Sequence, residues 1–151
     1  MHALTDELFD LFNGKNLKDK QHEAFMLLTV SEDVCPHTAM VSVGEVVATD
    51  HNTLRLALWP ESQTTQNIVR SGKAMLVLFY NSKAVYITLS LEPLATLKEA
   101  KFPRARFVAK VVHCREDVAK YAEITSGVKI NLKDSDDVLA RWQATIQELL
   151  L

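Results

Sequence analysis

The amino-acid sequence predicts an α+β protein that is mainly β, a six-stranded antiparallel split β-barrel with flanking helices. Three observations lead to this fold class. Six segments between residues 24 and 114 are apolar runs or alternate apolar and polar residues with the two-residue period of a strand. A single short helical segment, 63–71, interrupts them, whereas a parallel sheet needs a long crossover between neighbouring strands. A closed barrel is one way for an antiparallel sheet to lose its free edges.

Length and charge limit the classes of function. The chain has 151 residues, which fits a single domain over 1–151, and its net charge of -2 gives no general attraction to nucleic acid or to an acidic membrane. No apolar run reaches the ~20 residues of a membrane-spanning helix, and acids interrupt the first twelve residues, unlike a secretory signal. We therefore expect a cytoplasmic protein in which Cys35 and Cys114 are reduced.

The elements follow in order along the chain. Leu4, Leu8, Leu11 and Phe12 recur at helical spacing behind a capping Thr5, and Asn13-Gly14 ends that helix. Gly72 lies just past the central helix, a position that glycine favours. The predicted strands are 24–31, 37–50, 54–59, 73–81, 84–94 and 104–114, and the other helices are 116–124 and 136–151. In the last helix, Val138, Leu139, Trp142, Ile146 and Leu149 form an apolar stripe that we expect to pack on the barrel or on a second subunit.

Small polar residues gather directly behind the third strand, at the start of the central helix. They are Ser62, Gln63, Thr64, Thr65 and Asn67. Helix N-termini prefer hydroxyl and amide side chains because these satisfy unpaired amides, so capping is one interpretation. The second interpretation is an anion site, because a helix N-terminus offers free N–H groups and a partial positive charge.

Three segments resemble those of one protein superfamily. They are PHTAMVSVG (36–44), LRLALWPESQTTQNIVRSGKAML (54–76) and AVYITLSL (84–91). In order and spacing they resemble the flavin-contacting segments of the FMN-binding split-barrel superfamily, the pyridoxamine 5'-phosphate oxidase-like proteins, and the chain is similar to its small stand-alone members. The resemblance covers roughly residues 20 to 115.

The resemblance implies a set of cofactor-binding residues. The second strand lies against the isoalloxazine ring in this superfamily, which implies contacts from Thr38, Met40, Val41 and Ser42. The end of the third strand and the helix behind it hold the ribityl chain and phosphate. The implied residues there are Leu58, Trp59, Ser62, Gln63, Thr64, Thr65 and Asn67.

One position departs from the superfamily pattern. Larger members place an Arg-Lys pair just after the serine, where this chain has Gln63 and Thr64. A phosphate would then depend on backbone amides, hydroxyls and a cation from elsewhere in the chain. The available cations are Arg70, Lys73, Arg104 and Arg106. This departure leaves the deazaflavin F420 and haem as alternative ligands.

Several residues keep two interpretations. Trp59 either stacks on a flavin or closes the barrel rim. Arg104 and Arg106, on one strand face with Lys110, form either a solvated face or a phosphate contact. His37 is expected to be a structural hydrogen-bonding residue, whereas a haem reading would use the histidines at 22, 37 and 113 as axial ligands.

The function follows from the resemblance together with what the sequence lacks. No Ser-His-Asp order, HExxH motif or P-loop is present, so we expect the chemistry to belong to a bound cofactor, with no metal. The resemblance implies a homodimer with flavin sites at its interface, to which apolar residues such as Ala39, Val41 and Val43 would be suited. We expect an FMN-dependent oxidoreductase acting on a small molecule by hydride or electron transfer, with no catalytic residue identified. The alternative is a flavin-binding protein, or one binding F420 or haem, without turnover.

Overall fold

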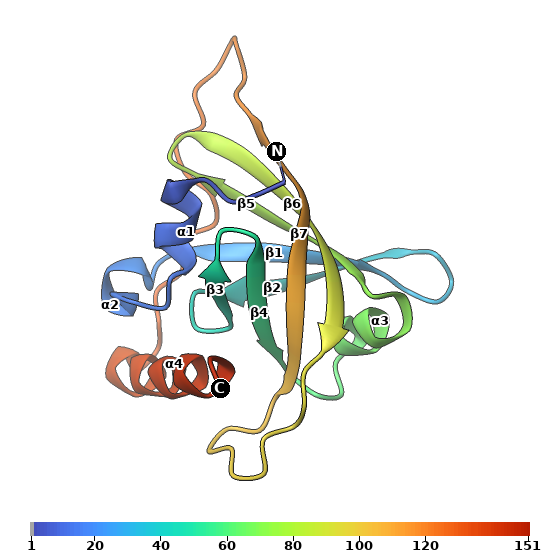
Figure 1. Cartoon of the computed structure of the whole chain (residues 1–151). Helices are drawn as coiled ribbons and strands as arrows, with labels where there is room; N and C mark the ends of the chain where they lie inside the picture. Colours follow the sequence, from blue (N-terminus) through green and yellow to red (C-terminus); the bar gives the residue numbers. More distant parts are fainter. Residues whose placement is uncertain (1) are drawn as a thin grey trace.

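The structure is a curled antiparallel sheet with four helices beside it (Figure 1). It is a computed structural model that describes residues 2–151. The helices are α1 (Asp6–Phe12), α2 (Leu17–Lys20), α3 (Gln63–Ser71) and α4 (Ser135–Leu149). The strands are β1 (Ala24–Val30), β2 (Pro36–Ser42), β3 (Val46–Asp50), β4 (Thr53–Leu58), β5 (Lys73–Tyr80), β6 (Lys83–Pro93) and β7 (Ala105–Asp117).

The strand order explains the curl of the sheet. It runs β2-β1-β5-β6-β7-β4-β3, with all neighbouring strands antiparallel. The two edge strands, β2 and β3, are consecutive in the chain and only three residues separate them, 43–45. The sheet must therefore bend round until its edges come close. This half-barrel confirms the mainly β, split-barrel prediction.

The interior of the curled sheet is apolar. Leu27, Leu56, Leu76, Ile87 and Phe107 come from five different strands and are almost wholly buried. Fully burying one such side chain contributes roughly 1.5–3 kcal/mol, so these inward faces supply most of the driving force for the curl. Helix α1 adds its apolar stripe to this core, as predicted, in the form of Leu8, Leu11 and Phe12.

The predicted second strand is two strands, so the sheet has seven strands instead of six. A tight turn divides 37–50 after Ser42, where the Glu45 amide donates to the Ser42 carbonyl at 3.1 Å. The Ser42 hydroxyl also accepts from the Gly44 amide at 3.3 Å. Apolar residues stand on both sides of Gly44-Glu45, at Val43 and Val46, so the two strands were predicted as one.

The predicted helix over 116–124 is wrong. Strand β7 instead continues to Asp117, which pairs with Ala84 of β6. Beyond it the chain has no regular structure up to the short bridge of Lys129 with Glu23. Tyr121 is 94% exposed, so this segment lacks a buried apolar face that would stabilise a helix.

Helix α4 packs beside β3 and β4 (Figure 1). Ile146 and Leu149 are buried and Trp142 is half-buried, which confirms the predicted stripe as packing against the barrel. Gly44 makes this docking possible, because a Cβ at that position would lie 2.1 Å from Cγ of Trp142. The indole ring therefore lies directly on the backbone of the turn between β2 and β3.

Two further predictions concern thiols and membranes. Cys35 is exposed, Cys114 is buried, and both are free thiols. Within residues 2–151, no helix combines the length and apolar character required to cross a bilayer.

Candidate functional site

The polar segment at the start of α3 forms a helix cap. The Ser62 hydroxyl accepts from the Thr65 amide at 3.1 Å. The Thr65 hydroxyl in turn donates to the Trp59 carbonyl at 2.6 Å, which ties the helix to the end of β4. The capping interpretation therefore accounts for both hydroxyls, although it leaves the amides of Gln63 and Thr64 at the open end of the helix.

Asn67 holds α3 against β1. It is completely buried, and its Nδ2 donates to Oγ1 of Thr29 at 2.9 Å. Its Oδ1 accepts from Nε2 of Gln63 at 2.8 Å and from the guanidinium of Arg70 at 3.2 Å. Every polar group of this amide is used inside the protein, so Asn67 acts on the fold by fixing the helix.

A cleft of about 280 Å³ opens between the end of β4, the β2–β3 turn and α4. We call it the Trp59 cleft. Four stretches of chain that are distant in sequence contribute to it. It is lined by Met40, Gly44, Glu45, Ala57, Trp59, Arg104, Arg141, Trp142 and Thr145.

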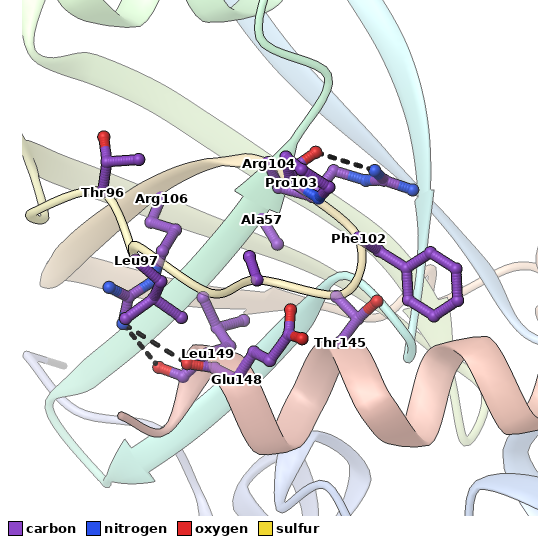
Figure 2. Close-up of a pocket in the computed structure, with 11 residues that line it drawn as sticks. Ala57, Thr96, Leu97, Phe102, Pro103, Arg104, Arg106, Thr145, Glu148 and Leu149 are labelled. Atoms are coloured by element: carbon purple, nitrogen blue, oxygen red, sulfur yellow. Dashed lines mark hydrogen bonds between the residues drawn. The ribbon is translucent and has the colours of Figure 1, made fainter.

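The aromatic wall of the Trp59 cleft carries a positive charge. Trp59 is 65% exposed, and the Arg104 guanidinium lies 4.1 Å from the centre of its ring. Nη1 of Arg104 donates to the Pro103 carbonyl at 2.9 Å (Figure 2). This cation–π contact fixes the guanidinium at the mouth of the cleft.

A carboxyl group faces the same space from the β2–β3 turn. Oε1 of Glu45 accepts from the Ser42 hydroxyl at 2.7 Å. Burial raises the pKa of the Glu45 carboxyl above its ordinary value, while the Ser42 hydrogen bonds and the charge of Arg104 oppose that rise. Glu45 therefore holds its proton to a higher pH than a surface glutamate does.

Arg106 does not belong to a solvated face. It is only 9% exposed, and it donates to the Ala95 carbonyl at 2.7 Å. It also reaches the carbonyls of Glu148 and Leu149 at the end of α4, both at 3.5 Å, while Arg104 extends away from it (Figure 2). Burial, and then the nearby charge of Arg55, lower the pKa of Arg106.

Arg106 and the half-buried Arg55 together fasten the last turn of α4. Nη1 of Arg55 donates to the Leu149 carbonyl at 3.0 Å, so both guanidiniums meet the negative end of the helix dipole. The expectation of a solvated face at Arg106 is wrong for a simple physical reason. A strand face that alternation marks as polar is covered here by α4 and by the loop 94–104, and nothing in the local pattern shows that cover.

No protein-family model matches the chain. One relative matches over nearly its whole length. It is the uncharacterized protein YclD of Bacillus subtilis (strain 168), which is 46% identical over 149 residues, or 99% of this chain and 97% of YclD. This chain belongs to the YclD family. The relationship extends over nearly the whole of both chains, so it includes the residues of the Trp59 cleft and helix α4 beside it.

Solved structures identify the fold. A variant of HupZ from group A Streptococcus superposes with a TM-score of 0.59 at 17% identity, covering 75% of this chain and 98% of that one. A pyridoxamine 5'-phosphate oxidase-like protein from Lactobacillus delbrueckii gives 0.58 at 23% identity, covering 76% and 95%. An FMN-binding protein from Syntrophomonas wolfei gives 0.50 at 17% identity, covering 74% and 87%. The fold of this YclD-family chain is thus the split barrel of the pyridoxamine 5'-phosphate oxidase-like proteins.

The structure brings some predicted cofactor residues together and separates others. Met40 and Trp59 line the cleft, and Thr38 is exposed on the same strand as Met40. Val41, Ser42 and Leu58 are buried. Ser62, Gln63, Thr64, Thr65 and Asn67 form or follow the cap of α3.

The apolar interface residues need a correction. Val41 and Val43 are 2% and 1% exposed, so they belong to the core. Only Ala39 of that set is half-buried. The exposed apolar side chain of β2 is Met40 at 53%. The predicted alternation of β2 is correct, but the apolar face that we expected at a dimer interface packs into the core of the same chain.

The histidines do not converge. His37 is on β2 and His113 on β7, and three strands lie between these two in the sheet. His22 lies before β1, where its Nδ1 is 2.9 Å from the Ile130 carbonyl. Over residues 2–151, no three His, Cys, Asp or Glu side chains are grouped so that they could hold a metal ion.

Among the cleft residues that sequence reasoning missed, three are charged or aromatic: Glu45, Arg141 and Trp142. Trp142 had been recognised only as part of a packing stripe. Glu45 carried a usable signal, since a charged residue stands inside an otherwise apolar strand pattern between Gly44 and Val46. Such a residue marks either a turn or a buried polar site, and here it is at both.

Proposed function

We propose that this YclD-family protein binds FMN and acts as a flavin-dependent oxidoreductase on a small molecule. The observation that carries the proposal is the Trp59 cleft. It joins Met40 of β2 to Trp59 at the end of β4, and these are the two segments that contact the flavin in the superfamily that the sequence resembles. The likeness of the fold to an FMN-binding protein supports the same conclusion.

The residues present suit a flavin in two respects. Met40 and Trp59 offer exposed apolar and aromatic surface to a flat ring. The cap of α3 uses the Thr65 amide and leaves the amides of Gln63 and Thr64 for a phosphate, at the positive end of a helix of nine residues. A bound flavin would supply the hydride or electron transfer, while the protein positions and shields it.

We also propose a homodimer in which a second copy covers the β2 edge. β2 pairs on one side only, with β1, and it exposes Met40 and Thr38 beside the proposed flavin site. A second copy there would enclose the ring. Size-exclusion chromatography with light scattering measures this directly, and a monomer in the presence of saturating FMN would contradict it.

The first experiment is an absorption spectrum of the freshly purified protein and of the supernatant after heat denaturation. We expect the two bands of oxidised flavin, released into the supernatant. Protein freed of ligand is then titrated with FMN, with F420 and with haem in parallel. A protein that takes up F420 or haem instead of FMN refutes the FMN assignment, and one that takes up none of them refutes the cofactor class.

Variants sharpen this titration. Trp59→Leu should weaken FMN binding about tenfold, equivalent to about 1.4 kcal/mol, because a stacking surface is lost. The matched control is Tyr121→Leu, which removes an aromatic ring that is 94% exposed and outside the cleft. Anaerobic addition of NADH or NADPH to the FMN-loaded protein separates the two functional classes. Bleaching of the flavin bands supports an oxidoreductase, whereas a flavin that stays oxidised supports a binding protein without turnover.

A further inference from the structure

Two opposite charges face the Trp59 cleft without pairing to each other. Glu45 and Arg104 both line it, yet no ion pair within 4.0 Å joins either of them to any group in residues 2–151. The field of Arg104 still acts on Glu45. Charges that are close enough to interact and too far apart to touch leave room for a molecule between them.

Each charged group is held in place with bonding capacity left over. Glu45 uses Oε1 for the Ser42 hydroxyl, and its Oε2 has no partner among the residues described. Arg104 is fixed by the Trp59 ring and donates only from Nη1, to Pro103. Its other N–H groups are free for a bidentate contact with a carboxylate or phosphate.

The third charged group of the cleft, Arg141, already has an ion-pair partner. Arg141, on α4, has Nε 3.5 Å from Oδ2 of Asp137 one turn earlier. Trp142 also lines the cleft, lying against Gly44. The charged groups that face Glu45 are therefore Arg104, before β7, and Arg141, on α4.

We propose that the part of the Trp59 cleft between Arg104 and Glu45 is a substrate site, next to the surface of Met40 and Trp59 assigned to the flavin, in which Arg104 binds an anionic group of the substrate and Glu45 exchanges a proton with it. This inference rests on the proposed function, because the electrons come from a reduced flavin. The structure supports it through the free Oε2 of Glu45, the free edge of Arg104, and a cleft of about 280 Å³ that both tryptophans line. The buried state of Glu45, which favours its protonated form, agrees with this role.

The step balances as a two-electron reduction. A bound reduced flavin would supply a hydride, and with it two electrons, to one atom of a substrate double bond. The π electron pair would move to the neighbouring atom, which would take the proton from Glu45 Oε2. The substrate would gain two electrons and two hydrogens, and Glu45, left as a carboxylate, would regain a proton from water through the open cleft.

Anion binding is tested with probes, in both flavin-free and FMN-loaded protein. Benzoate and its neutral counterpart benzamide are titrated while tryptophan fluorescence is recorded, since two tryptophans line the cleft. We expect benzoate to bind at least tenfold more tightly, and Arg104→Gln to abolish that preference. The matched control is Arg115→Gln, because Arg115 also lies on an aromatic ring, that of Tyr86, at 4.4 Å but outside the cleft.

Arg104→Lys provides a second variant that keeps the charge. It should retain part of the benzoate preference, which shows that a loss in Arg104→Gln is not caused by misfolding. Equal affinity for benzoate and benzamide in the parent protein overturns the anion site. So does displacement of benzoate by FMN with a parallel loss of FMN affinity in Arg104→Gln, because the flavin would then fill the space between Arg104 and Glu45 as well as the surface of Met40 and Trp59.

The role of Glu45 is tested by infrared difference spectroscopy across a pH titration. We expect a protonated carboxyl band that titrates above the range of exposed glutamates, disappears in Glu45→Gln, and shifts when benzoate binds. In FMN-loaded protein, reoxidation by the substrate should fall at least tenfold in Glu45→Gln while benzoate affinity is kept. A carboxyl band that does not shift when benzoate binds overturns the assignment of Glu45 as the proton donor. If FMN never binds but benzoate depends on Arg104, the flavin function fails and the anion site stands.

Discussion

Replacing Gly44 with alanine should detach Trp142 from the barrel. A Cβ at position 44 would lie 2.1, 2.3 and 2.4 Å from Cγ, Cδ1 and Cδ2 of the indole. Carbon atoms in contact are separated by roughly 3.5–4.0 Å, so the indole ring has to move by more than about 1 Å. The atoms in the way belong to the rigid ring system at its attachment point, which cannot rotate aside while α4 stays docked.

The cost follows from the burial of Trp142. Removing a large, fully buried aromatic side chain costs roughly 3–5 kcal/mol, and forcing extra atoms into a packed site costs roughly 1–3 kcal/mol. Trp142 is half-buried, whereas Ile146 and Leu149 of the same helix remain anchored in the core. We therefore expect a loss of about 2 kcal/mol in the free energy of unfolding. For a chain of this length that corresponds to a fall of about 4–8 °C in Tm.

The assay is a double-mutant cycle measured by urea unfolding. The parent protein is compared with Gly44→Ala, Trp142→Ala and the double variant. Gly44→Ala should cost about 2 kcal/mol in the parent and less than about 0.5 kcal/mol when residue 142 is alanine, because the clash is gone. An equal cost in both backgrounds would refute the reasoning, since the turn backbone itself would then require glycine.

Three further predictions concern stability. Asn67→Ala should lower the free energy of unfolding by about 2 kcal/mol, because it leaves the buried Thr29 hydroxyl without its partner; an unchanged urea midpoint would contradict the structural role. Burial raises the pKa of Glu45 in the folded state, so its contribution to stability is full below the ordinary value of 4.5 and is lost as the pH rises through the folded value. The Glu45→Gln variant should therefore become more stable relative to the parent protein as the pH rises through the folded-state pKa of Glu45. A difference between the urea midpoints of the two proteins that stays constant from about pH 4 to about pH 8 would contradict this prediction. Arg106→Ala should free the Ala95 carbonyl and the last turn of α4, so amide hydrogen exchange should accelerate there while β1 stays protected.

Local patterns were sufficient for most of the elements. Helix α3 begins at Gln63 and ends at Ser71, and Gly72 adopts φ 68° with its amide on the Ile68 carbonyl, as the glycine position predicted. The sequence could not reveal that β7 continues beyond Cys114, because its last residues are polar and are held by pairing with β6. Propensity favoured a helix there, and the neighbouring strand decided against it.

The candidate site was predictable only where one segment supplies it. Met40 and Trp59 were identified from their own strands, and both line the cleft. Glu45 and Trp142 are 97 positions apart, from 45 to 142, and their neighbourhood depends on how α4 docks. Buried Arg106 shows the same limit, since the cover that hides it comes from residues 95 and 148–149.

The strand order has a consequence for how the chain acquires its shape. β2, β1, β5 and β6 form one continuous group, β3 and β4 form a separate hairpin, and β7 is the strand that bonds to both groups. Until β7 has been synthesised, β4 and β6 therefore each have an unpaired edge. Pairs such as Thr53 with Lys110 also require the closure of long loops, which slows folding. Without β7 the other strands can form only two separate sheets, and the cleft requires both the joining of these sheets by β7 and the docking of α4.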